Sequence, residues 1–294
     1  MNIIRSRRFL STTSKSSPVS DLAKILVIPI TQNKSYIHFK FNENLINNDS
    51  LIVKYENKLS NIALKGWTRL KDSDKSYNQK IVHYVEKFLE RTPWSENSLI
   101  SIPSKATILR QAFEENNKDD NKPDSKPSIL LLNDTDIELN NKGENLLNIP
   151  VYYPGSLMSS TQLKNELLTL SSKGQTYHKK QMILNGIGIP ISLPFMLVPV
   201  IPNIPGFYLA YRLYCNLKAF LGAEHLEQIA KRGDLSFLDH EILDQIYSKQ
   251  DKTNDILLNE EIINDLVKTF EIDDAKAHLL KALKQEKEAL ESKP

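Results

Sequence analysis

The amino-acid sequence predicts an α+β protein that is mostly helical and that carries one proline-broken apolar membrane segment. Short β-like runs lie in the first half of the chain, whereas apolar residues at helical spacing dominate the rest. Residues 182–211 contain no charged side chain, although 25% of the chain is charged. We therefore expect small N-terminal strands and helices, the apolar segment near residue 200, and a helical C-terminal region.

The composition argues against several functional classes. With 294 residues, of which 40% are hydrophobic, the chain can bury one substantial core or two modest ones. The formal net charge of +2 provides no large basic face, so we expect no nucleic-acid partner. Cys215 is the single cysteine, which excludes an internal disulfide framework and leaves a thiolate zinc site without its other ligands. We expect no metal and no cofactor.

Residues 1–20 have the composition of a mitochondrial transit peptide. They are rich in serine and contain no acidic side chain, and their basic residues are Arg5, Arg7, Arg8 and Lys15. Residues 8–11, Arg-Phe-Leu-Ser, resemble a processing site, although the exact cleavage position stays open. The alternative interpretation is a disordered basic tail. A transit peptide predicts that the chain is imported into mitochondria.

The N-terminal region, residues 21–113, combines strands with helices. An apolar run and an alternating run predict two strands, which a polar turn joins into a hairpin. Apolar residues at helical spacing then predict three helices, the second of which ends before Pro93. The expected elements are strands over 24–30 and 36–41 and helices over 50–70, 77–89 and, with Ser101 or Ser104 as its cap, 102–113.

A polar linker separates this region from the second half of the chain. Residues 114–128 contain two prolines and no apolar side chain, so burial cannot offset the entropy of ordering them. Residues 129–181 follow, and their expected elements are strands over 129–132 and 149–153 and a long helix from about Thr161. The helix is expected because apolar residues recur three and four positions apart as far as Tyr177.

Residues 182–206 are the expected membrane segment, since a membrane-spanning helix needs about 20 apolar residues. A proline inside a helix costs about 3 kcal/mol and frees a carbonyl that lipid cannot satisfy. The segment contains the prolines Pro190, Pro194, Pro199, Pro202 and Pro205. Three interpretations stay open. The segment is a kinked span, a hairpin whose turn is formed by residues 202–206 with Gly206 as its last residue, or a buried apolar plug of a soluble domain.

The residues on either side of this segment are typical of a membrane boundary. Two lysines precede the segment and tyrosines follow it: Lys179, Lys180, Tyr208, Tyr211 and Tyr214. Basic residues flank both ends, so the positive-inside rule slightly favours a hairpin with both ends in the matrix. Residues 207–232 are expected to form an aromatic amphipathic helix. The remaining region, 233–294, is expected to be helical, with helices over 235–247, 259–270 and 273–290.

The sequence contains no GxSxG, Walker or HExxH motif, so we do not expect an enzyme. The candidate contacts for an ion path or a lipid headgroup are Arg212, Asn203, Glu224 and His225. Arg212 stands at the membrane boundary, where it either snorkels to the headgroups or contacts an ion. Histidine titrates near neutral pH, so Glu224 and His225 form either a proton-carrying pair or an ordinary pair on a helix surface.

Several short runs together resemble the fungal mitochondrial potassium/proton exchange-related family. They are Gly66-Trp67, residues 150–154, residues 197–205, Tyr208, Tyr211-Arg212 and residues 222–226. The resemblance covers most of the chain after residue 20, apart from the polar linker, and the run from Leu197 to Pro205 is its most specific part. It implies a mitochondrial inner-membrane protein that is connected with potassium/proton exchange. It assigns no transport residue.

We therefore expect an accessory or regulatory component of potassium/proton exchange, with its soluble parts facing the matrix. One apolar segment per chain does not enclose an ion path, because lipid offers charges no partner. The expected partners are the lipid bilayer, potassium ions, and either an inner-membrane exchanger or further copies of the chain as a homo-oligomer. The alternative is a matrix-facing, membrane-anchored interaction or assembly scaffold with no direct ion role.

Overall fold

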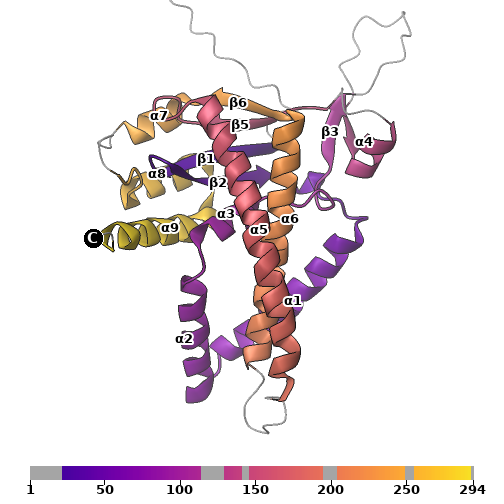
Figure 1. The fold of residues 1–294 in the computed structure, drawn as a ribbon, viewed down its shortest axis with the longest axis vertical. Helices are drawn as coiled ribbons and strands as arrows, with labels where there is room; N and C mark the ends of the chain where they lie inside the picture. The colour runs from indigo at the N-terminus through magenta and orange to yellow at the C-terminus, as the bar shows by residue number, and fades with distance from the viewer. Residues whose placement is uncertain (1–21, 114–128, 141–145, 195–203, 249–254, 293–294) are drawn as a thin grey trace, which may run out of the picture.

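A four-stranded mixed sheet lies at the centre of the computed structural model, which describes residues 22–113, 129–140, 146–194, 204–248 and 255–292 (Figure 1). β1 (Ala23–Thr31) and β2 (Lys34–Phe41) form an antiparallel hairpin. β5 (Ile149–Tyr153) pairs with β1 in parallel, and β6 (Leu235–Asp239) pairs with β5 in parallel. The strand order is therefore β2-β1-β5-β6. The predicted transit peptide and the predicted polar linker lie outside the described residues.

Helices cover both faces of this sheet (Figure 1). One face carries α3 (Trp94–Ser101), α5 (Ser160–Ser192) and α6 (Ile204–Arg232), and the other carries α7 (Glu241–Tyr247), α8 (Glu260–Phe270) and α9 (Asp273–Glu291). β1 reads as a continuous apolar run because a strand buried on both faces needs apolar side chains on both. Ile25 and Val27 enter the first core, and Leu26 and Ile28 enter the second.

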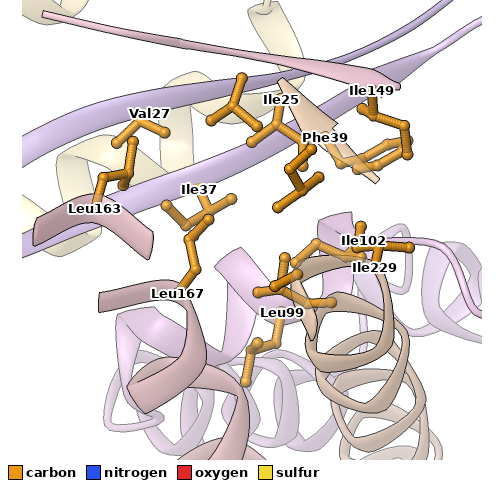
Figure 2. Packing of buried hydrophobic residues seen from close by; sticks show 14 of the residues in the cluster. Ile25, Val27, Ile37, Phe39, Leu99, Ile102, Ile149, Leu163, Leu167 and Ile229 are labelled. Atoms are coloured by element: carbon orange, nitrogen blue, oxygen red, sulfur yellow. The ribbon is translucent and has the colours of Figure 1, made fainter. Parts of the chain in front are cut away.

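Figure 2 shows the first of these cores, between the sheet and the α5–α6 pair. Leu163 and Leu167 project from α5 toward the sheet, and Leu99 lies beside them. All three side chains are almost completely buried, with exposed fractions of 0%, 0% and 1%. Ile37 and Ile25 meet them from the strands. This packing fixes the sheet-proximal ends of the two long helices.

α5 and α6 form an antiparallel hairpin that extends away from the sheet along the long axis of the molecule (Figure 1). With 33 and 29 residues, they are about 50 Å and 44 Å long. Ser159 caps α5, because its hydroxyl oxygen accepts a hydrogen bond from the Gln162 amide at 3.2 Å. Gly174 of α5 faces Ala223 of α6 and the side chain of Leu99. Small residues at this crossing let the helices and α3 approach closely.

Gly222 lies against the end of α3, and a Cβ at this position would lie 2.2 Å from the carbonyl oxygen of Leu99. Backbone atoms cannot rotate aside as a flexible side chain can. We therefore expect Gly222→Ala to lower the free energy of unfolding by about 1–3 kcal/mol, measured by urea denaturation. Gly186→Ala is the control, because a Cβ there meets nothing within 4 Å and alanine favours a helix. Equal stability of Gly222→Ala and the wild type would contradict the close approach.

Two amphipathic helices, α1 (Leu51–Lys71) and α2 (Ser76–Glu90), lie beside the hairpin and extend toward its free end (Figure 1). Glu56 of α1 accepts a hydrogen bond from the Tyr214 hydroxyl at 3.1 Å and pairs with Lys218 at 2.6 Å. Lys281 of α9 donates to the carbonyl oxygen of Leu89 at the end of α2, at 2.9 Å. These side-chain contacts attach α1 and α2 to the rest of the molecule.

The remaining described elements lie near the other end of the hairpin (Figure 1). They are η1 (Glu43–Leu45), the antiparallel strands β3 (Arg110–Phe113) and β4 (Ile129–Leu132), and α4 (Asp134–Asn140). Arg110 joins the small sheet to the end of α6 through a 2.9 Å ion pair with Asp234, in which both side chains are largely buried.

Most predicted elements are confirmed, and two predictions are wrong. Residues 102–113 do not form the expected helix. The helix of this region, α3, ends at Ser101, and residues 110–113 form β3, which pairs with β4. The helix expected over 235–247 begins only at Glu241, because residues 235–239 form β6 beside β5. Five residues are too few to separate helical from strand periodicity, and pairing with a buried strand decides the outcome.

No helix within residues 22–113, 129–140, 146–194, 204–248 and 255–292 is both long and apolar enough to cross a bilayer.

The predicted membrane segment, residues 182–206, is divided between two helices, so the kinked-span interpretation is not supported. Residues 182–192 continue α5, and residues 204–206 begin α6. Pro190 lies in the last turn of α5, Pro194 lies after its end, and Pro205 lies in the first turn of α6, where no intrahelical N–H bond is needed. Pro199, Pro202 and Asn203 lie outside the described residues.

Candidate functional site

The free end of the α5–α6 hairpin is an apolar surface on which the described residues expose no charged side chain. We define residues 181–194 and 204–215 as the hairpin tip. Arg212 is the single charged residue of this tip, and it is buried, with an exposed fraction of 7%. The exposed side chains of the tip include Ile183, Leu184, Ile187, Ile191, Leu193, Phe207 and Tyr211. Exposed apolar side chains that gather in this way mark surfaces that bind membranes or other proteins.

The tip begins immediately after two exposed lysines. Thr176, Lys179 and Lys180 line a shallow groove on α5 together with Ile183 and Leu184, and the volume of this groove is about 360 Å³. Their spacing of three and four residues places them on one face of the helix. Along this face the side chains change from charged to apolar within one helical turn.

Arg212 does not face the solvent, because it forms an ion pair with Glu96 of α3. Its Nη1 and Nη2 donate to Oε1 and Oε2 of Glu96 at 2.5 Å and 2.7 Å, and the two side chains are 9% and 3% exposed. Burial alone lowers the pKa of Arg212, but the hydrogen bonds and charge of Glu96 outweigh this effect and raise it. The guanidinium therefore stays charged and is held by two charge-assisted hydrogen bonds.

This ion pair is extended by a buried hydrogen-bonded chain between α6 and α5. Nδ2 of Asn216 donates to the carbonyl oxygen of Arg212 at 2.7 Å, and Oδ1 of Asn216 lies 2.7 Å from Nδ1 of His178. An amide oxygen only accepts, so Nδ1 of His178 carries the proton. Burial lowers the pKa of His178, although the bond to Asn216 opposes this shift. We call Glu96, His178, Arg212 and Asn216 the polar cluster; it ties α3, α5 and α6 together.

The two members of the predicted Glu224–His225 pair have different environments, although both lie on α6. His225 is buried, and its Nδ1 donates to the carbonyl oxygen of Pro103 at 2.6 Å, whereas Glu224 is exposed. Burial lowers the pKa of His225 to about 4. The histidine is therefore neutral near pH 7, which removes the titration on which a proton-carrying pair depends.

The depressed pKa of His225 predicts a loss of stability in acid. A neutral histidine with a folded pKa near 4 and an ordinary unfolded value contributes stability that is present above pH 6.5 and falls as the pH drops. At pH 5 the loss amounts to about 2 kcal/mol relative to pH 7. Urea denaturation at the two pH values measures it. In His225→Asn, whose amide can donate to Pro103 in place of Nδ1, the difference in stability between the two pH values should shrink; an unchanged difference would contradict this assignment.

The tyrosines predicted at the membrane boundary have different environments. Tyr208 contacts Phe88 of α2, with ring centroids 5.8 Å apart, and Tyr214 donates to Glu56 of α1. Tyr211 is 44% exposed on the hairpin tip. Lys179 and Lys180 are both exposed. Only Tyr211 and the two lysines thus combine the predicted boundary position with an outward-facing side chain.

Sequence reasoning missed Glu96 as the partner of Arg212, since the two residues are 116 positions apart. It also missed His178 and Asn216. One signal was available, because Arg212 and Asn216 are four residues apart on the helix face that carries Ala219 and Ala223. A charged residue on a face of small apolar residues indicates a buried partner.

Comparisons with known proteins agree with the resemblance stated from the sequence. A family model described as "Mitochondrial K+-H+ exchange-related" matches residues 24–230. An uncharacterized protein of Saccharomyces cerevisiae is 33% identical over 296 aligned residues, which cover 96% of this chain and 90% of the relative. An uncharacterized protein of Schizosaccharomyces pombe is 28% identical over 222 residues, which cover 76% of this chain and 81% of the relative.

No solved structure matches the chain. The family match extends from β1 to residue 230, near the end of α6, so it includes the polar cluster and the hairpin tip. It associates the chain with mitochondria and with a role related to K+-H+ exchange. The chain belongs to the mitochondrial K+-H+ exchange-related family.

Proposed function

We propose that this chain is an accessory or regulatory component of mitochondrial K+-H+ exchange and that the hairpin tip holds it at the inner membrane by entering the bilayer without crossing it. The observation that supports this proposal most strongly is the exposure of the tip. Its exposed side chains are apolar over the whole described length, and its one charge is neutralised inside the protein by Glu96. Such a surface can enter the hydrocarbon core of a bilayer, because no exposed charged side chain has to be transferred out of water.

The length of the tip favours partial insertion. Residues 181–193 extend for about 20 Å at the rise of an α-helix, whereas the hydrocarbon core of a bilayer is about 30 Å thick. The two limbs are antiparallel, so both leave the bilayer on the side where they entered. The basic residues Lys179 and Lys180 then lie at the headgroup level on that side, which the positive-inside rule assigns to the matrix.

The accessory role follows from the chemistry of the tip. Potassium needs oxygen ligands or water along its route through a membrane. The exposed side chains of a single apolar hairpin provide neither. Arg212 and Glu96 form a buried ion pair with each other, so their charges hold α3 against α6 and are not available to a passing ion. Ion movement is then the task of a partner exchanger or of an assembly of several copies.

Swelling of isolated mitochondria in potassium acetate tests this function, because swelling requires K+-H+ exchange. Mitochondria from cells that lack the protein should swell more slowly, and expression of the wild-type chain should restore the rate. Ile187→Ser/Ile191→Ser, which makes the exposed tip polar, should not restore it. Ile242→Ser/Leu280→Ser is the matched control, since these side chains are 44% and 38% exposed on α7 and α9.

Unchanged swelling in mitochondria that lack the protein would overturn the exchange role. If the chain nevertheless remained bound to the inner membrane, the result would favour the alternative of an anchored interaction or assembly scaffold. Restoration by the tip variant would separate the exchange role from membrane insertion.

A further inference from the structure

We propose that the outer face of α5 binds an anionic phospholipid, with the phosphate held by Lys179 and Lys180 and an acyl chain lying along Ile183 and Leu184. This inference rests on the proposed insertion of the hairpin tip and names the lipid class that the tip selects. It concerns a site on α5 alone, separate from the buried polar cluster.

The geometry of the groove matches a ligand that is charged at one end and apolar at the other. Thr176, Lys179, Lys180, Ile183 and Leu184 line it and are spaced along two turns of one helix face. The opposite face of α5 is buried against α6 and the sheet and includes Leu167, Gly174 and His178. The groove therefore points away from the protein core. Ile187 and Ile191 continue its apolar side toward the end of the helix, at 56% and 68% exposure.

Charge complementarity selects an anion for the lysine end. Neither Lys179 nor Lys180 forms an ion pair with an acidic side chain within the described residues, whereas several other lysines in that part of the chain do. Lys34, Lys71, Lys218 and Lys231 pair with carboxylates at 2.6–2.9 Å. α5 contains four lysines and one glutamate, and that glutamate, Glu166, accepts hydrogen bonds from Ser35. The positive charge at this end of the groove is left for a ligand.

The apolar end of the groove distinguishes a lipid from a free phosphate. Ile183 and Leu184 are 56% and 53% exposed directly beside the lysines. A soluble phosphate would use the ammonium groups and leave these side chains in water. A phospholipid uses both ends, because its phosphate meets the lysines while its acyl chain covers the apolar side chains.

Flotation of the purified full chain with lipid vesicles tests the site. Vesicles of phosphatidylcholine with phosphatidylglycerol should bind the wild type more tightly than vesicles of phosphatidylcholine alone. Lys179→Gln/Lys180→Gln should weaken binding to the anionic vesicles about thirtyfold, since each lysine near an anionic surface contributes about a fivefold gain. Lys276→Gln/Lys287→Gln is the matched control, because both lysines are exposed on α9 away from the groove.

Each outcome of this experiment has a distinct meaning. Equal binding of the wild type to both vesicle types would overturn the lipid preference but leave membrane insertion intact. Binding to neither type would overturn the insertion itself. An equal loss in the α9 control would show that charge in general, and not this groove, attracts the anionic surface. Displacement by inorganic phosphate, but not by chloride at the same ionic strength, would assign the lysines to a soluble anion.

Discussion

Replacing Glu96 with alanine is expected to lower the free energy of unfolding by about 3–5 kcal/mol. The change leaves the guanidinium of Arg212 buried with no carboxylate partner, and removing one member of a buried ion pair costs far more than the pair contributes. Since small domains are stable by only about 5–15 kcal/mol, this variant should unfold at a much lower urea concentration. Glu90→Ala is the control, because Glu90 and Lys284 form a 3.7 Å pair in which both side chains are mostly exposed.

A double variant separates the orphaned charge from lost packing. Glu96→Leu/Arg212→Met removes both charges and keeps similar side-chain volumes, so it should regain most of the stability that Glu96→Ala loses. A double variant as unstable as the single one would show that packing, and not the ion pair, holds α3 against α6. A loss of less than 1 kcal/mol in Glu96→Ala would contradict the buried environment of Arg212.

Introducing two carboxylates into the hairpin tip, in Ile187→Asp/Ile191→Asp, is expected to abolish binding to lipid vesicles. An aspartate at the centre of a membrane helix is less favourable than isoleucine by about 3 kcal/mol or more. Two such changes reduce binding by well over a hundredfold. The folded structure should persist, because both isoleucines are more than half exposed.

Flotation measures this loss, and thermal unfolding followed by circular dichroism checks that the variant is folded. The control Ile242→Asp/Leu280→Asp places two carboxylates at exposed apolar positions of α7 and α9 and should bind vesicles as the wild type does. A folded Ile187→Asp/Ile191→Asp variant that still floats would exclude the tip as the membrane contact.

The elements predicted best from sequence are those whose signals are local. The alternating run of β2 and the apolar run of β1 specify their hairpin, and Ser159, just before the predicted start of the long helix at about Thr161, caps α5. Asn259, at the start of the helix predicted over 259–270, caps α8, and its side-chain oxygen accepts a hydrogen bond from the amide of Ile262 at 2.8 Å. Each of these features depends on residues within a few positions of one another.

The features that escaped prediction depend on contacts across the chain. β6 is a strand because β5 lies beside it, although the two are separated by the whole α5–α6 hairpin. Arg212 and His225 resemble surface residues in sequence, yet Glu96 and Pro103 give them buried partners. No local pattern reports such pairings. The apolar character of the tip was predictable, but its exposure on two separate helix ends was not.

The two long helices α5 and α6 connect the hairpin tip directly to neighbouring strands of the sheet. β5 leads through residues 154–159 into α5, and α6 returns within two residues to β6, the neighbouring strand. Two stiff rods about 50 Å and 44 Å long therefore transmit any tilt at their far ends to two adjacent strands. The polar cluster, in which Glu96 of α3 binds Arg212 of α6, lies between the two ends of the hairpin. With the tip inserted as proposed above, a tilt of the tip would therefore also move β5 and β6.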